Sequence, residues 1–172
     1  MRDASPAAIS HRAGAAKMSI YRHFAGKDDL VAAALAEREP RHRGWLVGSE
    51  VPSPDIGTVL EVFDRVASAA DGTPFTGCPY VNACLELRDA RHPAVAVARE
   101  HKQLVVADLR ARLSEVGVKR PARLARTLLM LLDGATVHAV LAGSGAPLRE
   151  ARDTARALVA IALEGAADGS PA

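Results

Sequence analysis

The residues best suited to chemistry lie near the start of the chain, where basic and polar side chains follow one another closely. Residues 1–27 contain five basic residues and one acidic residue, although the net charge of the whole chain is only +2. Basic clusters favour phosphate, because neutralising it releases condensed counterions. A solvated helix surface gives the same pattern. The charge distribution alone therefore leaves both a nucleic-acid partner and an ordinary charged surface open.

Two short helices joined by a tight turn are expected to position these side chains. Ser5 is suited to cap the first helix, Pro6 suits its first turn, and Gly14 is suited to end it. The second helix is expected over residues 16–23. A third begins near Gly26 and has acidic residues in its first turn, which suits the helix dipole. This arrangement is typical of a helix-turn-helix.

The second short helix has the composition of a surface that reads DNA. Ile20 and Phe24 are four residues apart and are expected to face the core. Donors on the opposite side can reach base edges, an apolar group can meet a thymine methyl, and a phenol or a cation can hold phosphate. The outer side is expected to carry Lys17, Met18, Tyr21 and Arg22, with Ser19 partly exposed.

The rest of the chain is expected to be helical as well. Prolines and glycines separate the apolar periods, and β-branched alternation is nearly absent. The third helix is expected to continue past Glu39 despite Pro40. The further helices are predicted over residues 56–70, 80–88, 93–116, 121–142 and 147–164.

The N-terminal residues resemble a known DNA-binding signature. Residues 13–24 read Ala-Gly-Ala-Ala-Lys-Met-Ser-Ile-Tyr-Arg-His-Phe, and residues 26–30 read Gly-Lys-Asp-Asp-Leu. They resemble the pattern of tetracycline-repressor (TetR) type regulators, Ala-Gly-Val-Ser-x-x-Thr-Leu-Tyr-x-His-Phe and then x-Lys-x-x-Leu. The segment Gly-Cys-Pro-Tyr-Val-Asn-Ala at residues 77–83, with Glu86 beyond it, is similar to a Gly-Cys-x-x-x-Asn segment of many members.

The resemblance implies an all-α homodimer with two domains. Residues 1–43 would form the helix-turn-helix DNA-binding domain with its connecting helix, and residues 44–172 the helical ligand-binding and dimerisation domain. Family members have a full helix before the one that starts at Ser5, and only residues 1–4 precede it here. We therefore expect a helix-turn-helix that lacks the first helix. Such proteins bind palindromic double-stranded DNA operators, usually repress, and release DNA when a small-molecule effector binds.

The resemblance also implies roles for single residues. Base-facing positions correspond to Lys17, Met18, Ser19 and Arg22. Phosphate-contacting positions correspond to Ser5, Tyr21 and Lys27. His23 corresponds to a position with either a structural role or a backbone contact, and both alternatives stay open. Phe24 corresponds to a core position.

The C-terminal part combines sparse polar groups with an apolar setting, as a small-molecule pocket requires. Each candidate also has an ordinary structural interpretation: Phe63 and Met130 as core residues, Asp133 and His138 as interface residues, and Cys84 as a packed thiol. The candidate ligand-binding residues are Trp45, Phe63, Tyr80, Asn82, Cys84, His101, Met130, Asp133 and His138.

The last two helices are expected to form the homodimer. Between residues 128 and 142 only Asp133, Thr136 and His138 are polar, and a helix that is apolar all round must be covered on both sides. Two such helices suit half of a four-helix bundle completed by two-fold symmetry. A single buried helix in a monomer is the alternative. We expect no membrane span, because the apolar run is short and interrupted.

No enzyme is predicted. The six histidines are scattered, and the sequence contains no His-Glu-x-x-His, Cys-x-x-Cys, Gly-x-Ser-x-Gly or P-loop pattern. No metal or other cofactor is therefore expected. A helical small-molecule-binding protein or an enzyme without DNA binding is the alternative to the regulator. Two cysteines and no expected secretory signal favour a cytoplasmic location.

Overall fold

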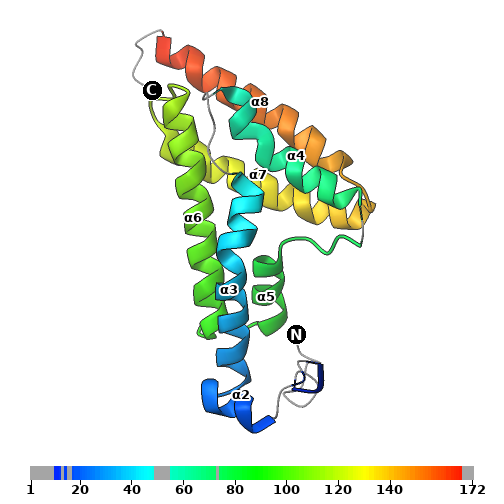
Figure 1. Cartoon of the computed structure of the whole chain (residues 1–172). Helices are drawn as coiled ribbons and strands as arrows, with labels where there is room; N and C mark the ends of the chain where they lie inside the picture. Colours follow the sequence, from blue (N-terminus) through cyan, green and yellow to red (C-terminus); the bar gives the residue numbers. More distant parts are fainter. Residues whose placement is uncertain (1–9, 13, 15–16, 49–54, 73, 168–172) are drawn as a thin grey trace. The chain divides into compact units, whose positions relative to one another are not determined.

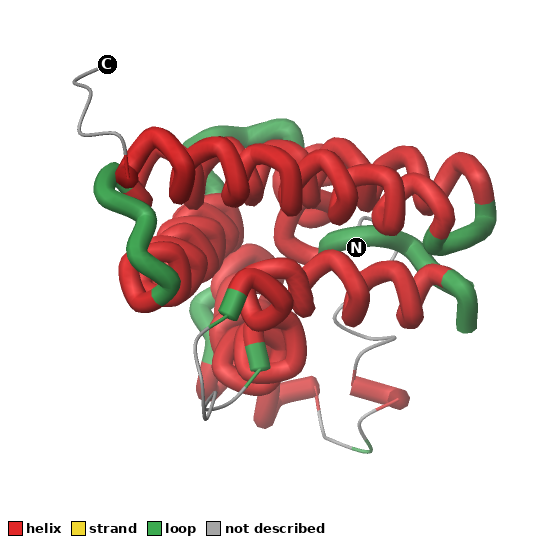
Figure 2. The backbone as a smooth tube through the Cα atoms, turned by 90° about the horizontal axis from the view of Figure 1, so that it is seen from above, coloured by secondary structure: helices red, strands yellow, loops and turns green. Residues whose placement is uncertain are grey.

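A computed structural model describes residues 10–12, 14, 17–48, 55–72 and 74–167, and the structural statements below concern these residues. Every regular element among them is a helix, as Figure 2 shows, which confirms the all-α prediction. The helices labelled in Figure 1 are α2 (Lys17–His23), α3 (Lys27–Val47), α4 (Ile56–Ala70), α5 (Pro79–Leu87), α6 (Pro93–Glu115), α7 (Pro121–Ala142) and α8 (Ala146–Ala167).

Local capping explains where several helices begin and end. The Asp55 carboxylate accepts a hydrogen bond from the Thr58 N–H at 2.9 Å and so caps α4. Pro121 begins α7, where its missing N–H leaves no intrahelical bond unmade. Gly143 ends α7 in the left-handed conformation with φ 62°. The predicted ranges 56–70 and 121–142 are confirmed, because the signals that define them are local.

Helix α3 continues through Pro40, as predicted, and reaches Val47. A proline inside a helix has no N–H to donate, so the carbonyl of Ala36 loses its intrahelical partner. The described residues at the end of the first predicted helix agree with the expectation there: residues 10–12 are helical and Gly14 has φ 61°. The start of that helix, including Ser5, lies outside the described residues.

The chain forms two compact units, each of which is described by itself. Unit 1 comprises Met1–Pro40 and Pro79–His101, and unit 2 comprises Arg41–Cys78 and Lys102–Ala172. Helices α3 and α6 therefore contribute residues to both units. The predicted boundary after residue 43 separates DNA binding from ligand binding, and it stays a prediction.

The core of unit 2 lies among α4, α7 and α8, which pack against one another, and α6 adds side chains to it. Phe63 is fully buried there, so its interpretation as a core residue is confirmed. Apart from Phe63, the large side chains that fill this core are aliphatic, in line with the low aromatic content. They include Val59, Leu60, Leu109, Leu113, Leu128, Leu148 and Val159.

The turn between α7 and α8 lies directly against the end of α4. A Cβ atom at Gly145 would lie 2.4 Å from the carbonyl oxygen of Ala67, so only glycine fits here. The Gly145 N–H donates to the Asp71 carboxylate at 2.7 Å, and the Arg149 guanidinium donates to the same carboxylate at 2.7 Å. These hydrogen bonds, that from Arg149 first, hold the pKa of Asp71 below its ordinary value. The close contact of Gly145 with Ala67 and the ion pair between Asp71 and Arg149 thus hold the α7–α8 turn against the end of α4.

Helix α7 is long and apolar enough to cross a membrane by length and composition alone, and it is the one described helix that meets this criterion. The helix has 22 residues and is therefore longer than the apolar run at residues 128–142, from which no membrane span was expected. A buried core helix meets the same criterion. Leu128, Leu132 and Ala139 of α7 are buried in the core of unit 2, which favours the interpretation as a core helix.

Candidate nucleic-acid interface

Helix α2 exposes four of the eight side chains that were predicted to contact DNA. Met18 is 79% exposed and Tyr21 is 48% exposed, and Arg22 and His23 are exposed as well. Ser19 is partly buried, as expected for a position at the edge of the outer surface. One side of a seven-residue helix thus presents an apolar group, a phenol and a guanidinium to solvent.

Two predicted contacts, Ser5 and the side chain of Lys17, lie outside the described residues, and so does the side chain of Ile20, which was predicted to face the core. The backbone of Lys17 and Ile20 belongs to α2. Phe24 is partly buried rather than fully buried.

The turn that joins α2 to α3 is fixed by hydrogen bonds to the start of α3. The Leu30 N–H donates to the Gly26 carbonyl at 3.1 Å and closes the first turn of the helix. The Asp29 carboxylate reaches back and accepts from the Ala25 N–H at 3.2 Å. An acidic side chain that binds a preceding N–H stabilises the start of a helix. This contact holds α2 at a short, defined distance from Lys27, the first residue of α3.

A second contact in unit 1 links the first turn of α3 to the start of α6. The Nε2 atom of His92 lies 3.2 Å from a carboxylate oxygen of Asp28. The His92 Nδ1 atom accepts a hydrogen bond from the Ala94 N–H at 3.1 Å, which caps α6. The His92 side chain is 7% exposed and that of Asp28 is 71% exposed. The contact therefore lies at the surface next to the turn that carries Lys27.

Tyr80 and His101, two of the predicted ligand residues, form a buried pair in unit 1. Their rings are stacked with centroids 3.8 Å apart, and both side chains are fully buried. The Tyr80 hydroxyl donates to the Leu35 carbonyl of α3 at 3.3 Å. The His101 Nδ1 atom lies 3.3 Å from a carboxylate oxygen of Glu39. Both residues are thus bound to α3 just before Pro40.

The other predicted ligand residues have different environments. In unit 1, Asn82 is exposed and Cys84 is partly buried. In unit 2, the Asp133 carboxylate accepts from Lys102 at 2.5 Å, which joins α7 to α6. Trp45 is 42% exposed and its ring lies 5.6 Å from that of His42. The assignment of these residues to a ligand site stays a prediction.

Met130 and His138 lie on the exposed side of α7. Met130 is 67% exposed, so its interpretation as a core residue is wrong. The physical reason is its position on the helix, because the core of unit 2 takes the opposite side, with Leu128 and Leu132. One exposed stripe runs along α7. Its residues are spaced three or four positions apart, and they are Met130, Gly134, Val137 and Leu141.

Sequence reasoning missed several residues of unit 1 that have structural roles. Asp28 and Glu39 were not singled out, because a carboxylate on a predicted helix gives no sign of its distant partner. The His92-Pro93 pair was seen only as the start of a helix. The sequence signal was that His92 directly precedes a proline at the first helical position. A side-chain acceptor at such a position can cap the helix.

Comparisons with known proteins agree with this arrangement. The family pattern of bacterial regulatory proteins of the tetR family matches residues 1–34. A TetR-family transcriptional regulator from Streptomyces coelicolor is 26% identical, with 95% of this chain and 85% of that chain covered and a TM-score of 0.74. A protein described as a TetR transcriptional regulator from Streptomyces avermitilis is 33% identical, with 89% and 87% covered and a TM-score of 0.75.

A third solved structure shares the fold at lower identity. It is a TetR transcription regulator from Haloarcula marismortui, 21% identical, with 96% of this chain and 88% of that chain covered and a TM-score of 0.67. The search of curated proteins finds no match.

Proposed function

The chain belongs to the tetR family of bacterial regulatory proteins, and from this premise we propose that it is a ligand-responsive repressor that binds a palindromic operator as a homodimer. Regulators of this family bind DNA operators and typically act as dimers. The observation that carries the proposal is the exposed surface of α2, formed by Met18, Tyr21 and Arg22 within the matched residues 1–34. We further propose that it acts in the cytoplasm, where its DNA would be.

In this proposal α2 lies in the major groove. Met18 and Arg22 face base edges, where a guanidinium can bind the two acceptors of guanine and an apolar group can meet a thymine methyl. Tyr21 and Lys27 contact phosphates, which fixes the position of the helix without reading sequence. The hydrogen bond between Asp29 and the Ala25 N–H supports the proposed role of Lys27, because it holds Lys27 close to the end of α2.

We propose that a second copy of the chain covers the exposed stripe of α7. Met130, Val137 and Leu141 are 67%, 51% and 77% exposed, and Ile161 of α8 is 65% exposed. Gly134 lies within the stripe, and a Cβ atom there would meet nothing within 4 Å. Glycine inside a helix costs about 1 kcal/mol relative to alanine. At Gly134 the small residue leaves room for the close approach of a partner helix.

The effector is proposed to act by shifting the population between conformers. A ligand changes such an equilibrium only by its difference in affinity for the two states. In one state the two α2 helices match the spacing of the operator half-sites, and in the other they do not. Within each unit, the ligand contacts are proposed among the candidates that are at least partly exposed and lie outside the exposed stripe of α7. These are Asn82 and Cys84 in unit 1, and Trp45 and Asp133 in unit 2.

Selection of bound sequences from a pool of random duplex DNA tests the proposed function. We expect enrichment of palindromic sites whose half-sites lie about one helical turn, or more, apart. Lack of enrichment at low salt, by a protein that is folded and dimeric, would contradict it. That result would favour the alternative of a helical small-molecule-binding protein without DNA binding.

A further inference from the structure

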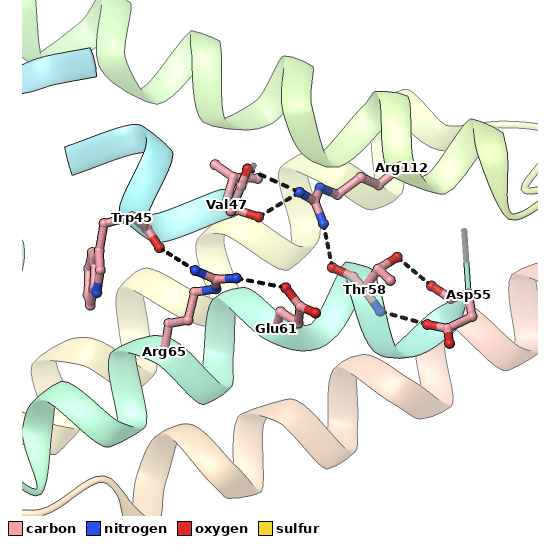
Figure 3. A network of polar contacts seen from close by, with 8 residues as sticks. Trp45, Val47, Asp55, Thr58, Glu61, Arg65 and Arg112 are labelled. Carbon is pink, nitrogen blue, oxygen red and sulfur yellow. Dashed lines mark hydrogen bonds and ion pairs between the residues drawn. The ribbon is translucent and has the colours of Figure 1, made fainter. Parts of the chain in front are cut away.

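Two arginines of unit 2 are bound to backbone carbonyl groups, as Figure 3 shows. Arg112 of α6 donates through Nη2 to the Val47 carbonyl at 2.6 Å and through Nη1 to the Thr58 carbonyl at 2.9 Å. Arg65 of α4 donates through Nη1 to the Trp45 carbonyl at 3.1 Å. The final carbonyl groups of a helix such as α3 have no N–H partner within the helix. These two guanidinium groups therefore have a structural role.

Two arginines of unit 1 differ from these. Arg88 and Arg91 lie in the turn between α5 and α6, and both are exposed. Within the described part of the chain, neither guanidinium donates a hydrogen bond. The Arg91 side chain is 96% exposed, and its Nε atom lies 4.0 Å from a carboxylate oxygen of Asp89. Contacts within the described structure therefore do not explain these two guanidinium groups.

Arg88 occupies a backbone position that favours glycine. It directly follows α5 with φ 53°, and it is the one described residue other than glycine with a positive φ. Its N–H donates to the Cys84 carbonyl at 3.1 Å, which ends the helix in the left-handed conformation. A side chain costs free energy in this conformation, whereas glycine adopts it freely. An exposed arginine at such a position points to a partner outside the chain.

The α5–α6 turn is held next to the first turn of α3 within unit 1. The contact of 3.2 Å between His92 Nε2 and a carboxylate oxygen of Asp28 joins the two segments, and Figure 1 shows the start of α6 beside the first turns of α3. Arg91 directly precedes His92, and Lys27 directly precedes Asp28. The Cα atoms of Arg91 and Lys27 are therefore at most about 20 Å apart, which corresponds to about six phosphates along one DNA strand. A duplex whose backbone passes Lys27 can thus also pass Arg91.

Three carboxylates lie on the same two segments, and each has a nitrogen atom of the chain beside it. The Asp29 carboxylate accepts from a backbone N–H at 3.2 Å, and the Asp89 carboxylate accepts from the Arg91 N–H at 2.9 Å. The Asp28 carboxylate lies beside His92. The acidic groups are therefore engaged by the protein, while the Arg91 guanidinium extends into solvent.

We propose that Arg88 and Arg91 bind phosphates of the DNA backbone on the same duplex as Lys27. A guanidinium can donate two parallel hydrogen bonds to one phosphate. Such contacts add affinity for every sequence, because the phosphate carries no base information. The α5–α6 turn is thus a second DNA-contacting element of unit 1, outside the matched residues 1–34. The inference rests on the proposed function, because α2 must bind DNA for this turn to meet it.

The salt dependence of DNA binding tests the role of Arg91. One probe is a duplex that the wild type selects from random DNA, with about ten flanking base pairs on each side, and the other is a scrambled duplex of equal length. Arg91→Ala is expected to weaken binding to both probes alike, by about three- to tenfold near 0.1 M salt. The slope of log affinity against log salt should become smaller by about 1 per subunit. Arg99→Ala is the matched control, because Arg99 is also exposed but lies two turns further along α6. A wild-type slope in Arg91→Ala overturns the proposal for Arg91.

Arg88→Gly separates DNA contact from a role in the fold. Glycine relieves the left-handed backbone, so we expect the melting temperature to rise by about 2–4 °C while the salt slope becomes smaller by about 1 per subunit. Arg88→Lys keeps a positive charge near the end of α5, where it also suits the helix dipole, and it should keep the wild-type slope. A wild-type slope in Arg88→Gly overturns the proposal for Arg88.

Lys27→Ala distinguishes failure of this inference from failure of the proposed function. If the wild type binds neither duplex at low salt, both fail. If the wild type binds and Lys27→Ala makes the slope smaller, while Arg91→Ala and Arg88→Gly leave it unchanged, the proposed function stands and this inference alone fails.

Discussion

His92 and Asp28 approach each other to 3.2 Å, and this contact joins the start of α6 to the first turn of α3 within unit 1. The approach is close without being a well-aligned hydrogen bond. Because His92 Nδ1 accepts the Ala94 N–H, a neutral ring carries its proton on Nε2, the atom that faces Asp28. One imidazole therefore serves two helices through its two nitrogen atoms.

The two roles of His92 can be separated by substitution. His92→Ala removes both and is expected to lower the free energy of unfolding by about 1–2 kcal/mol, mostly through the lost cap. His92→Asn keeps an acceptor for the Ala94 N–H, so we expect a smaller loss. Asp28→Ala should cost less than about 1 kcal/mol, because Asp28 is largely exposed. Urea denaturation measures all three, and equal losses in the two His92 variants would contradict the capping role.

Lys27 and Tyr21 are predicted to contact phosphate. Lys27→Ala should weaken binding to all sequences and lower the slope of affinity against salt by about 1 per subunit. Tyr21→Phe should weaken binding similarly across sequences, with little effect on the slope because no charge is lost. Arg22→Ala should instead change which bases are preferred. Fluorescence anisotropy at several salt concentrations measures these effects, and a slope unaffected by Lys27→Ala would contradict its role.

The exposed stripe of α7 is predicted to be the dimer interface. Leu141→Glu places a carboxylate where the partner helix would pack, and burying an unpaired charge is costly. We expect the dissociation constant of the dimer to rise by about 100-fold or more. Leu85→Glu on α5 is the matched control, because Leu85 is also exposed and apolar but lies outside the stripe. Sedimentation at micromolar concentration measures both, and a dimer unaffected by Leu141→Glu would refute this interface.

Gly145 is predicted to be essential for the packing of the α7–α8 turn on α4. Gly145→Ala places a methyl group 2.4 Å from the main-chain oxygen of Ala67, which no side-chain rotation can relieve. We expect a loss of about 1–3 kcal/mol in the free energy of unfolding. Gly44→Ala in α3 is the control, because a Cβ atom there meets nothing within 4 Å and alanine favours a helix by up to about 1 kcal/mol. The melting temperature and the midpoint of urea denaturation should therefore fall in Gly145→Ala and rise in Gly44→Ala.

Asp71 gives the protein a defined dependence on pH. Its pKa is lowered in the folded state, first by the hydrogen bond from Arg149 and then by that from the Gly145 N–H. The carboxylate therefore contributes stability above its unfolded pKa of about 3.9, and this contribution is lost as the pH falls through the folded pKa. The melting temperature of Asp71→Asn should lie below that of the wild type at pH 7, and the difference should shrink below about pH 4. A difference that does not change with pH would contradict the ionic role.

Much of the fold follows from local signals in the sequence. The cap at Asp55, the proline at position 121 and the left-handed Gly143 define helix ends through bonds between residues only a few positions apart. The apolar spacing of α4 likewise placed Phe63 in the core. The signature around Tyr21 and Lys27 was recognisable because its residues are consecutive.

The partners of the polar side chains could not be predicted in the same way. Nothing near Tyr80 or His101 in the sequence indicates that the two rings stack, and nothing near Met130 shows which side of α7 meets the core. Such facts depend on how helices are rotated about their axes when they pack.

The sequence by itself determined the helical class, the limits of α4 and α7 and the surface of α2 that resembles a DNA reader, because each depends on neighbouring residues. Only the tertiary structure decided that Arg112 caps a helix that ends 65 residues earlier at Val47, and that His92 meets Asp28. The physical reason is that hydrogen bonds and ion pairs act over about 3 Å, so their partners are chosen by the packing of distant segments.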